Sequence, residues 1–165
     1  MIRSFTLIEL VMVIVIMAII ASAAIPLLIS TTESWIIASR RNEMSESARI
    51  SLDRIIREIR ELRNDTSVIF ANNSSFRFLN LANANISFSL SGNTLQRTIN
   101  GTVNNLADNV NSLNFSYYNV TDSVISAPIV SPLATDIKRV QVDLVFSLGS
   151  TQLAVRAAVS PRRLE

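Results

Sequence analysis

The chain of 165 residues contains no cysteine and no histidine. It can therefore form no disulfide and no thiolate nucleophile, and the common zinc sites and nucleophile–base pairs cannot be built from its side chains. Only three glycines occur, and none lies in a phosphate-binding loop. Acidic residues are sparse after Asp65, and no acid and base converge in the sequence. We expect a protein that is not an enzyme and uses no cofactor or resident metal.

A strong excess of charge is also lacking, because the formal net charge is only +2. Seven arginines lie between Thr32 and Asp65, but seven acids lie among them. Such a row of arginines could contact DNA during uptake, since phosphate contacts give affinity that does not depend on sequence. The matched acids argue against nucleic acid as a partner.

What the sequence does have is one long apolar run. The 20 residues from Leu10 to Ile29 carry no charge, and at helical rise they cover roughly 30 Å, the thickness of the hydrocarbon core of a bilayer. Glu9 stands at the edge of this run, and Phe5 to Ile8 before it are apolar except for Thr6. A charge deep in lipid costs on the order of 3 kcal/mol, so an acid placed there indicates a function and a partner. The sequence predicts a single-pass membrane helix with Glu9 as its candidate functional residue.

The segment Phe-Thr-Leu-Ile-Glu from Phe5 to Glu9 follows a short basic leader and precedes this apolar helix. It resembles the N-terminal signature of type IV pilins and type II secretion pseudopilins. The resemblance implies that a prepilin peptidase cuts between Ser4 and Phe5 and methylates the new amine of Phe5. Ser4 stands where the family usually has glycine, and serine, like glycine, is small.

Pro26 falls where the same family commonly has a helix-breaking proline. Its ring must disturb the hydrogen bond to the carbonyl of Ser22, four residues earlier. We expect a helix kink or a locally melted turn at this point.

The resemblance also implies a function and a set of partners. The chain would be a structural subunit of a type IV pilus or a type II secretion-like filament. It would span the inner membrane once with its C-terminal domain exported, and would then enter a periplasmic or extracellular filament. Its partners would be other pilins or pseudopilins, the prepilin peptidase and the inner-membrane assembly platform, and Glu9 would act in assembly. Short stretches such as Leu95-Gln96-Arg97 and Val159 to Arg162 are similar to W-type minor pilins and J-type pseudopilins, which favours a minor or initiating subunit.

Other interpretations of the N-terminus remain open. The apolar run with Ala21-Ser22-Ala23 could be a secretory signal peptide, and the chain could also be a binding module on a plain single-span anchor. Both interpretations leave Glu9 without a purpose. Entry into a filament with pilin partners would separate a pilin from an anchored module, whereas the N-terminal motif alone does not distinguish a pilus, a secretion system and a DNA-uptake system.

The second half of the predicted helix differs from the first. No glycine or proline occurs between Leu27 and Asp65, and apolar residues recur at steps of three and four, which is typical of a helix that packs on a sheet. Oppositely charged residues four apart, such as Arg54 and Glu58, predict a solvated face whose charges pair along the helix. The predicted apolar stripe consists of Met44, Ala48, Leu52, Ile55, Ile56, Ile59 and Leu62.

After Ser67 the periodicity changes from 3.6 to 2, which predicts strands. The alternating segments are 76–81, 86–90, 94–99, 113–117, 139–148 and 153–159, with an Asn-Gly turn at 100–101, an ambiguous stretch at 106–110 and a loop at 121–135. The domains are then a leader (1–4), a transmembrane or filament-core helix (5–29), an amphipathic helix half (30–65) and a sheet domain (66–165). The fold class is α+β, a pilin-like long helix packed on an antiparallel sheet.

Two local features allow alternatives. Arg97 falls on the apolar face of its strand, either because the strand is an edge guarded by charge or because Arg97 makes a specific contact, and we favour the edge. Asp122 and Asp136 flank the proline-bearing loop and could bind calcium, which prefers oxygen ligands, although solvated turn residues are the plainer interpretation.

Overall fold

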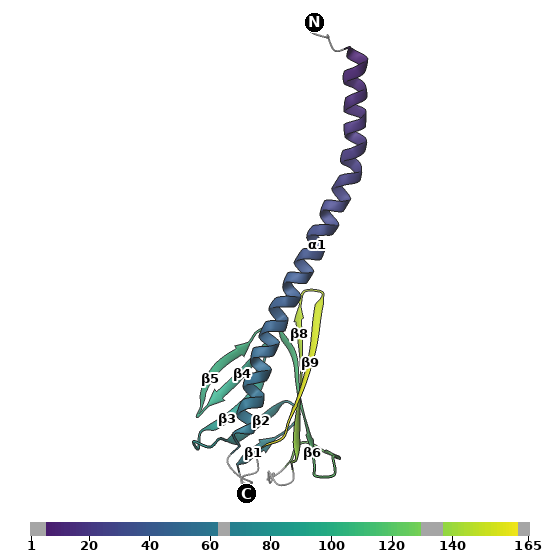
Figure 1. The fold of residues 1–165 in the computed structure, drawn as a ribbon. Coiled ribbons are helices and arrows are strands. Elements are labelled where there is room, and N and C mark those ends of the chain that lie inside the picture. The colour runs from purple at the N-terminus through teal and green to yellow at the C-terminus, as the bar shows by residue number, and fades with distance from the viewer. Residues whose placement is uncertain (1–5, 63–66, 130–136, 162–165) are drawn as a thin grey trace. The chain divides into compact units, whose positions relative to one another are not determined.

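The computed structural model describes residues 6–62, 67–129 and 137–161. Within these ranges the chain forms one long helix followed by nine strands (Figure 1). This arrangement confirms the α+β class and the antiparallel pairing of the strands. The elements are α1 (Leu7–Arg60), β1 (Val68–Ala71), β2 (Ser75–Leu79), β3 (Asn85–Ser91), β4 (Thr94–Ile99), β5 (Thr102–Ala107), β6 (Val110–Tyr118), β7 (Val124–Ile125), β8 (Arg139–Leu148) and β9 (Thr151–Val159).

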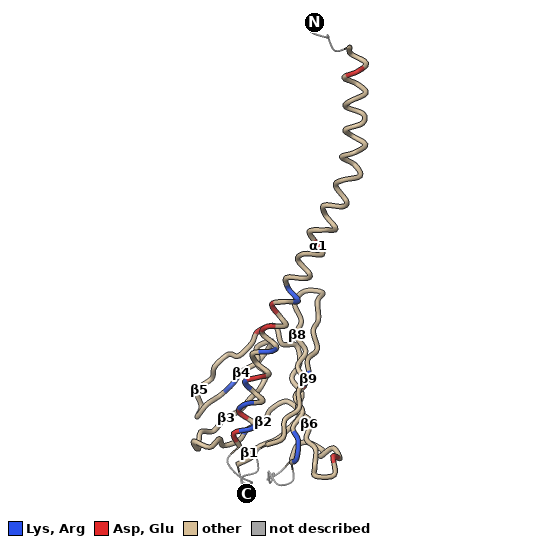
Figure 2. The backbone as a smooth tube through the Cα atoms, in the orientation of Figure 1, with Lys and Arg blue, Asp and Glu red and all other residues tan. Residues whose placement is uncertain are grey.

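The chain divides into two compact units, Met1–Ser39 and Arg40–Glu165. The described part of the first unit is helical from Leu7 onward. Glu9 is followed by an uncharged stretch of α1 that appears tan in Figure 2. By length and composition α1 could cross a membrane, as the sequence predicts.

Helix α1 is continuous through Pro26. The residues around the proline therefore keep helical geometry, and the melted turn, one of the two expected distortions, does not form. Pro26 still has no N–H to offer the carbonyl of Ser22, as its chemistry requires. The alternative, a kink at Pro26, stays a prediction.

The second unit contains two antiparallel sheets instead of the single sheet that the sequence suggested. Strands β1 to β5 form one sheet in sequence order, and the other has the order β7-β6-β8-β9. The chain passes from the first sheet to the second at Asp108-Asn109, inside the stretch that the sequence left ambiguous. Asn109 has a positive φ of 60°, and β6 then pairs with β8 and β7 and leaves β5 as an edge.

Tight turns join several of the strands. Asn100 and Gly101 both have positive φ, 48° and 90°, which is the backbone that a two-residue β-hairpin of type I′ requires. This turn closes β4 onto β5, as the Asn-Gly signal predicts. The β8–β9 hairpin turns at Gly149, whose φ of 63° favours glycine.

The predicted apolar stripe of α1 is confirmed as the part of the helix that enters the core. Its side chains join residues of both sheets in one buried cluster. Only Ile56 is half-buried, and two polar helix residues, Ser51 and Glu58, are buried among the apolar ones. The buried residues of the predicted stripe are Met44, Ala48, Leu52, Ile55 and Ile59 in α1, and Leu62, which lies just after the helix ends at Arg60 and forms an isolated β-bridge with Asn80.

Strands β1, β5 and β7 were missed because their burial does not alternate. In β1 a bulge between Val68 and Phe70 shifts the register, so two exposed residues stand side by side in the strand. Strand β5 is an edge with four consecutive exposed residues. Strand β7 is a two-residue pair within the predicted loop.

Candidate functional site

The first turn of α1 is organised around Thr6 and Glu9. The carbonyl of Thr6 accepts hydrogen bonds from the N–H groups of Glu9 (3.1 Å) and Leu10 (3.2 Å). In return, Oε2 of Glu9 accepts a long hydrogen bond of 3.5 Å from the N–H of Thr6. The spacing and this backward bond are those of a capping box, in which an acid three residues into the helix satisfies a free N–H at its start. The carboxylate also lies where the helix dipole favours negative charge.

This capping bond uses only part of what a carboxylate can accept. Glu9 is exposed, and within the described part of the chain its side chain has no second hydrogen bond or ion pair. An ionised carboxylate has about four acceptor positions. Glu9 is therefore able to bind a further positively charged or hydrogen-bonding group from outside the chain. Ser4 and Phe5, the predicted cleavage and methylation residues, lie outside the described residues.

From Leu10 to Ile29, the uncharged stretch that follows Glu9, the surface of α1 is apolar on nearly every side. From Leu10 to Ile29 every residue is exposed except Ala24, which is half-exposed. A helix that is hydrophobic all round is expected inside a membrane or a protein interior, and burying one such large side chain is worth about 1.5–3 kcal/mol. The large exposed side chains of this surface are Leu10, Val11, Met12, Val13, Ile14, Val15, Ile16, Met17, Ile19, Ile20, Ile25, Leu27, Leu28 and Ile29.

The second acid in apolar surroundings is Glu58, and here the structure corrects the sequence analysis. Glu58 is only 4% exposed, so its pair with Arg54 is not on a solvated face. Its other oxygen, Oε2, accepts a hydrogen bond of 2.7 Å from Nε of Arg97. A buried carboxylate is costly unless it is paired and hydrogen-bonded, and two arginines meet that requirement from one helix and one strand.

Arg97 is correspondingly not an edge residue. It lies on β4, which pairs with β3 on one side and β5 on the other, and it is 9% exposed. The alternative that we did not favour, a specific contact, is the correct one. Because no buried side-chain nitrogen or oxygen among the described residues lacks a partner, we interpret the Arg54–Glu58–Arg97 cluster as structural.

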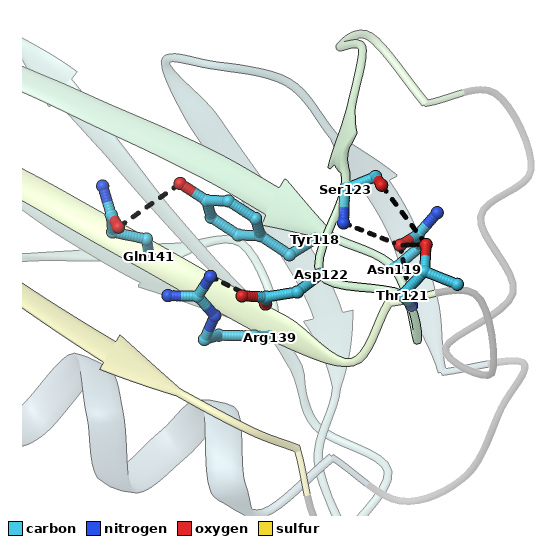
Figure 3. A network of polar contacts seen from close by, with 7 residues as sticks. All are labelled: Tyr118, Asn119, Thr121, Asp122, Ser123, Arg139 and Gln141. Atoms are coloured by element: carbon cyan, nitrogen blue, oxygen red, sulfur yellow. Dashed lines mark hydrogen bonds and ion pairs between the residues drawn. The ribbon is translucent and has the colours of Figure 1, made fainter.

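A third polar cluster lies on β6, β8 and the turn that follows β6 (Figure 3). Nη2 of Arg139 donates to Oδ1 of Asp122 at 2.8 Å, and its guanidinium lies 3.9 Å from the ring centroid of Tyr118. The side chain of Asn119 accepts hydrogen bonds from the N–H groups of Thr121 (3.0 Å) and Ser123 (2.9 Å). These contacts fix a turn.

The same cluster also tests the alternative that Asp122 and Asp136 bind calcium. The carboxylate of Asp122 already faces a guanidinium, and a cation neighbour disfavours binding of a second cation. Asp136 lies outside the described residues. Among the described residues no group of three or more acids could hold a metal ion.

Comparison of the chain with models of known protein families, and with the sequences of curated proteins, finds no match. The long apolar helix and the antiparallel sheets are compatible with a pilin-like fold. The family resemblance itself rests on the segment from Phe5 to Glu9 and on the apolar helix after it. Of the predicted site residues, the structure describes Glu9 at the first turn of α1 and Pro26 within that helix.

Proposed function

We propose that the protein is a structural subunit of a type IV pilin-like filament, in the role of a minor or initiating subunit. One observation carries this proposal: from Leu10 to Ile29 helix α1 exposes apolar side chains on nearly every side, and a carboxylate, that of Glu9, stands in its first turn just before this stretch. A membrane span alone would explain the apolar surface. It would not explain why an acid with spare acceptor positions stands at its edge.

In this proposal one apolar surface serves two environments. In the inner membrane the residues from Leu10 to Ile29 face lipid. When the subunit is extracted, the same side chains pack against neighbouring helices, so apolar contact is replaced by apolar contact and little hydrophobic free energy is lost. The exported unit folds around its own core and remains outside the membrane.

Glu9 has two roles in the proposed assembly. Within its own subunit it caps the first turn of α1 through the N–H of Thr6. Between subunits, its remaining oxygen positions bind the amine of Phe5 that cleavage after Ser4 creates on a neighbour. Two opposite charges in an apolar medium stabilise each other strongly, because each alone is poorly solvated there. The charge pair would set the axial register while apolar packing supplies adhesion.

The first experiment determines the mature N-terminus. Intact-mass analysis and N-terminal sequencing of the membrane-bound protein should find a start at Phe5 with a methylated amine. A start near Ala24 would instead establish a cleaved secretory signal, and an uncut Met1 would indicate a plain anchor. Either result overturns the proposal.

The second experiment separates the two roles of Glu9. In Glu9→Gln the side chain keeps an oxygen that can cap the N–H of Thr6, since glutamine also serves in a capping box, but it loses the charge. Glu9→Val loses both. We expect both variants to insert in the membrane and to be processed, and both to be missing from sheared or secreted filament fractions that contain the wild type.

The contrasting outcomes are informative. Normal incorporation of Glu9→Gln with failure of Glu9→Val would assign Glu9 to helix capping alone. Normal incorporation of both would show that the carboxylate has no part in assembly. If the wild-type chain is processed but enters no filament fraction, the protein is a membrane-anchored binding module.

A further inference from the structure

A second exposed apolar group lies just beyond the apolar run, still within the first unit. Trp35 is 74% exposed, and Ile36 and Ile37 are 41% and 49% exposed. Trp35 is the sole tryptophan of the chain. A large aromatic side chain is rarely left so open on a soluble surface, and the run of 20 uncharged residues before it does not extend this far. These residues therefore need an explanation of their own.

The distance along α1 between the end of the apolar run and Trp35 explains the exposure of Trp35. Trp35 follows Ile29 by six residues, which is about 9 Å at helical rise, and helical side chains lean back toward the N-terminus. The polar headgroup layer on each side of a hydrocarbon core is about 5–8 Å thick. When the stretch from Leu10 to Ile29 fills the core, the indole of Trp35 lies in the headgroup layer. Tryptophan is enriched at this level because its ring is apolar and its N–H is a hydrogen-bond donor.

The residues between the run and Trp35 are suited to the same boundary. Their hydroxyl groups donate to carbonyls of their own helix, so they bring few unsatisfied donors to the edge of the lipid. The carbonyl of Leu27 accepts from Oγ of Ser30 at 3.0 Å and from Oγ1 of Thr31 at 2.7 Å. Oγ1 of Thr32 donates to the carbonyl of Leu28 at 2.8 Å.

Glu33 is the one charged residue at this level. Glu33 lies two positions before Trp35, which at 3.6 residues per turn places it on nearly the opposite side of the helix. A tilt of about 20°, common for single spans, can therefore bring Trp35 toward the lipid while it brings Glu33 toward water.

We infer that Trp35 is a membrane-interface anchor. It binds the headgroup layer of the lipid bilayer on the side of the exported unit, and it sets the depth at which the apolar run sits before assembly. Ile36 and Ile37 extend the apolar contact. The inference rests on the membrane-spanning part of the proposed function and does not depend on filament formation. Continuity with the candidate span favours lipid over a protein partner as the occupant.

The sole tryptophan makes the test direct. The full chain is reconstituted in phosphatidylcholine vesicles that carry bromine, a fluorescence quencher, either near the headgroup end or near the methyl end of the acyl chains. We expect the emission of Trp35 to be shifted to shorter wavelength relative to the denatured chain, and to be quenched more by the shallow bromine than by the deep one. Emission typical of water with no quenching, or stronger quenching by the deep bromine, overturns the anchor.

A matched variant separates failure of the anchor from failure of the span. Trp35→Tyr combined with Ile16→Trp moves the sole tryptophan into the interior of the apolar run, and deep bromine should then quench more than shallow bromine. If this variant is not quenched by either lipid, the chain does not span the bilayer and the membrane part of the proposed function fails. If it is quenched as expected while Trp35 is not, only the anchor fails.

The depth-setting role has its own comparison. Trp35→Ala combined with Ile16→Trp removes the aromatic ring, whereas the tyrosine variant keeps an amphipathic ring suited to the interface. We expect the ratio of deep to shallow quenching at position 16 to shift in the alanine variant relative to the tyrosine variant. An unchanged ratio would show that the residue at position 35 does not set the depth.

Discussion

Two glutamates of helix α1 lie among apolar residues, and they differ in burial and in the number of their partners. Glu9 is exposed, and among the described residues its side chain has one long hydrogen bond, from the N–H of Thr6. Glu58 is 4% exposed and is paired with Arg54 and Arg97. The carboxylate in the second unit thus finds its partners within the chain, whereas most of the binding capacity of the first is left for a partner elsewhere.

The apolar residues of α1 show the same contrast. Ile16 is 54% exposed, whereas Ile55 is fully buried against the sheets. Side chains of one chemical type therefore stabilise the fold in one half of the helix and are available to lipid or to other subunits in the other half. Helical pattern and hydrophobicity alone therefore do not determine whether a helix packs against its own chain or against an external partner.

The largest expected effect comes from placing the same charge in each half. Ile55→Asp should cost more than about 4 kcal/mol of the free energy of unfolding, because it buries an unpaired carboxylate and removes a core side chain. In a fragment that starts at Thr31, urea unfolding followed by circular dichroism should find no folded baseline. Ile56→Asp, at a half-buried position, should be milder.

The matched change in the first half is Ile16→Asp in the full chain. It should leave the unfolding of the second unit unchanged and should weaken membrane insertion by on the order of 3 kcal/mol. Membrane fractionation and the same unfolding measurement in detergent check both expectations. A loss of stability of the second unit in Ile16→Asp would show that Ile16 also stabilises the folded domain, contrary to the different roles assigned to the two halves of α1.

The next effect concerns the buried pair. Arg97→Met removes one partner of Glu58, and breaking a buried ion pair from one side costs about 3 kcal/mol or more because a charge is left poorly compensated. Replacing both members, in Glu58→Leu with Arg97→Met, should recover part of the loss. Urea midpoints of the single and double variants of the fragment give the coupling free energy.

Arg156→Met is the control for that experiment. Arg156 pairs with Asp143 at an exposed position, where ion pairs contribute little, so the urea midpoint should hardly change. Equal losses at Arg97 and Arg156 would show that burial of the Glu58 cluster does not determine its contribution.

Much of the fold could be read from the sequence because its signals are periodic. The apolar stripe, the strands with alternating burial and the Asn100-Gly101 turn all follow from local patterns. Strands β1 and β5 could not be read in this way, since a bulge and an edge position remove the alternation. The division into two sheets depends on which strand β6 pairs with, and pairing between distant strands leaves no local signal.

The buried pair of Glu58 and Arg97 shows most clearly what the sequence alone could not predict. Glu58 lies three residues after Ile55, within the apolar stripe, and Arg97 lies on the apolar face of its strand. From the sequence alone, Glu58 is assigned to a solvated pair with Arg54, and Arg97 to a charge that guards an edge strand. Two opposite charges on the faces of two elements that pack together indicate a buried pair, but only once the helix is known to cover that strand. For Glu9 the pattern was sufficient to mark the residue, and the capping bond to Thr6 came from the structure.

A smaller effect tests how well the second unit excludes water. Burial raises the pKa of the Tyr117 phenol above its ordinary value of about 10, and its hydroxyl donates to the carbonyl of Asn72 at 2.8 Å. The folded state therefore keeps a proton that the unfolded state loses above pH 10. Stability from this residue is complete below pH 10 and should fall by about 1.4 kcal/mol per pH unit above it.

Tyr117→Phe supplies the comparison for this pH dependence. The variant should lose about 1 kcal/mol at pH 7 with the hydrogen bond to Asn72, and its stability should decline less steeply above pH 10 than that of the wild-type fragment. Urea unfolding at a series of pH values measures both. Parallel curves for the two proteins would mean that Tyr117 ionises as easily in the folded state as in the unfolded one.

The smallest expected effect is that of removing the first half of the helix altogether. The buried residues of α1 begin at Met44, and the residues from Leu10 to Ile29 take no part in the core. A fragment from Thr31 to Glu165 should therefore be soluble, unfold cooperatively and match the stability of the same unit in the full chain in detergent to within about 0.5 kcal/mol. A fragment that starts at Arg49 is the matched control: it also lacks Met44 and Ala48, which are 2% and 1% exposed, and it should lose several kcal/mol because two core positions are emptied. Aggregation of the Thr31 fragment, or melting without a transition, would show that the apolar half also stabilises the fold, and the contrast between the two halves of α1 would fail.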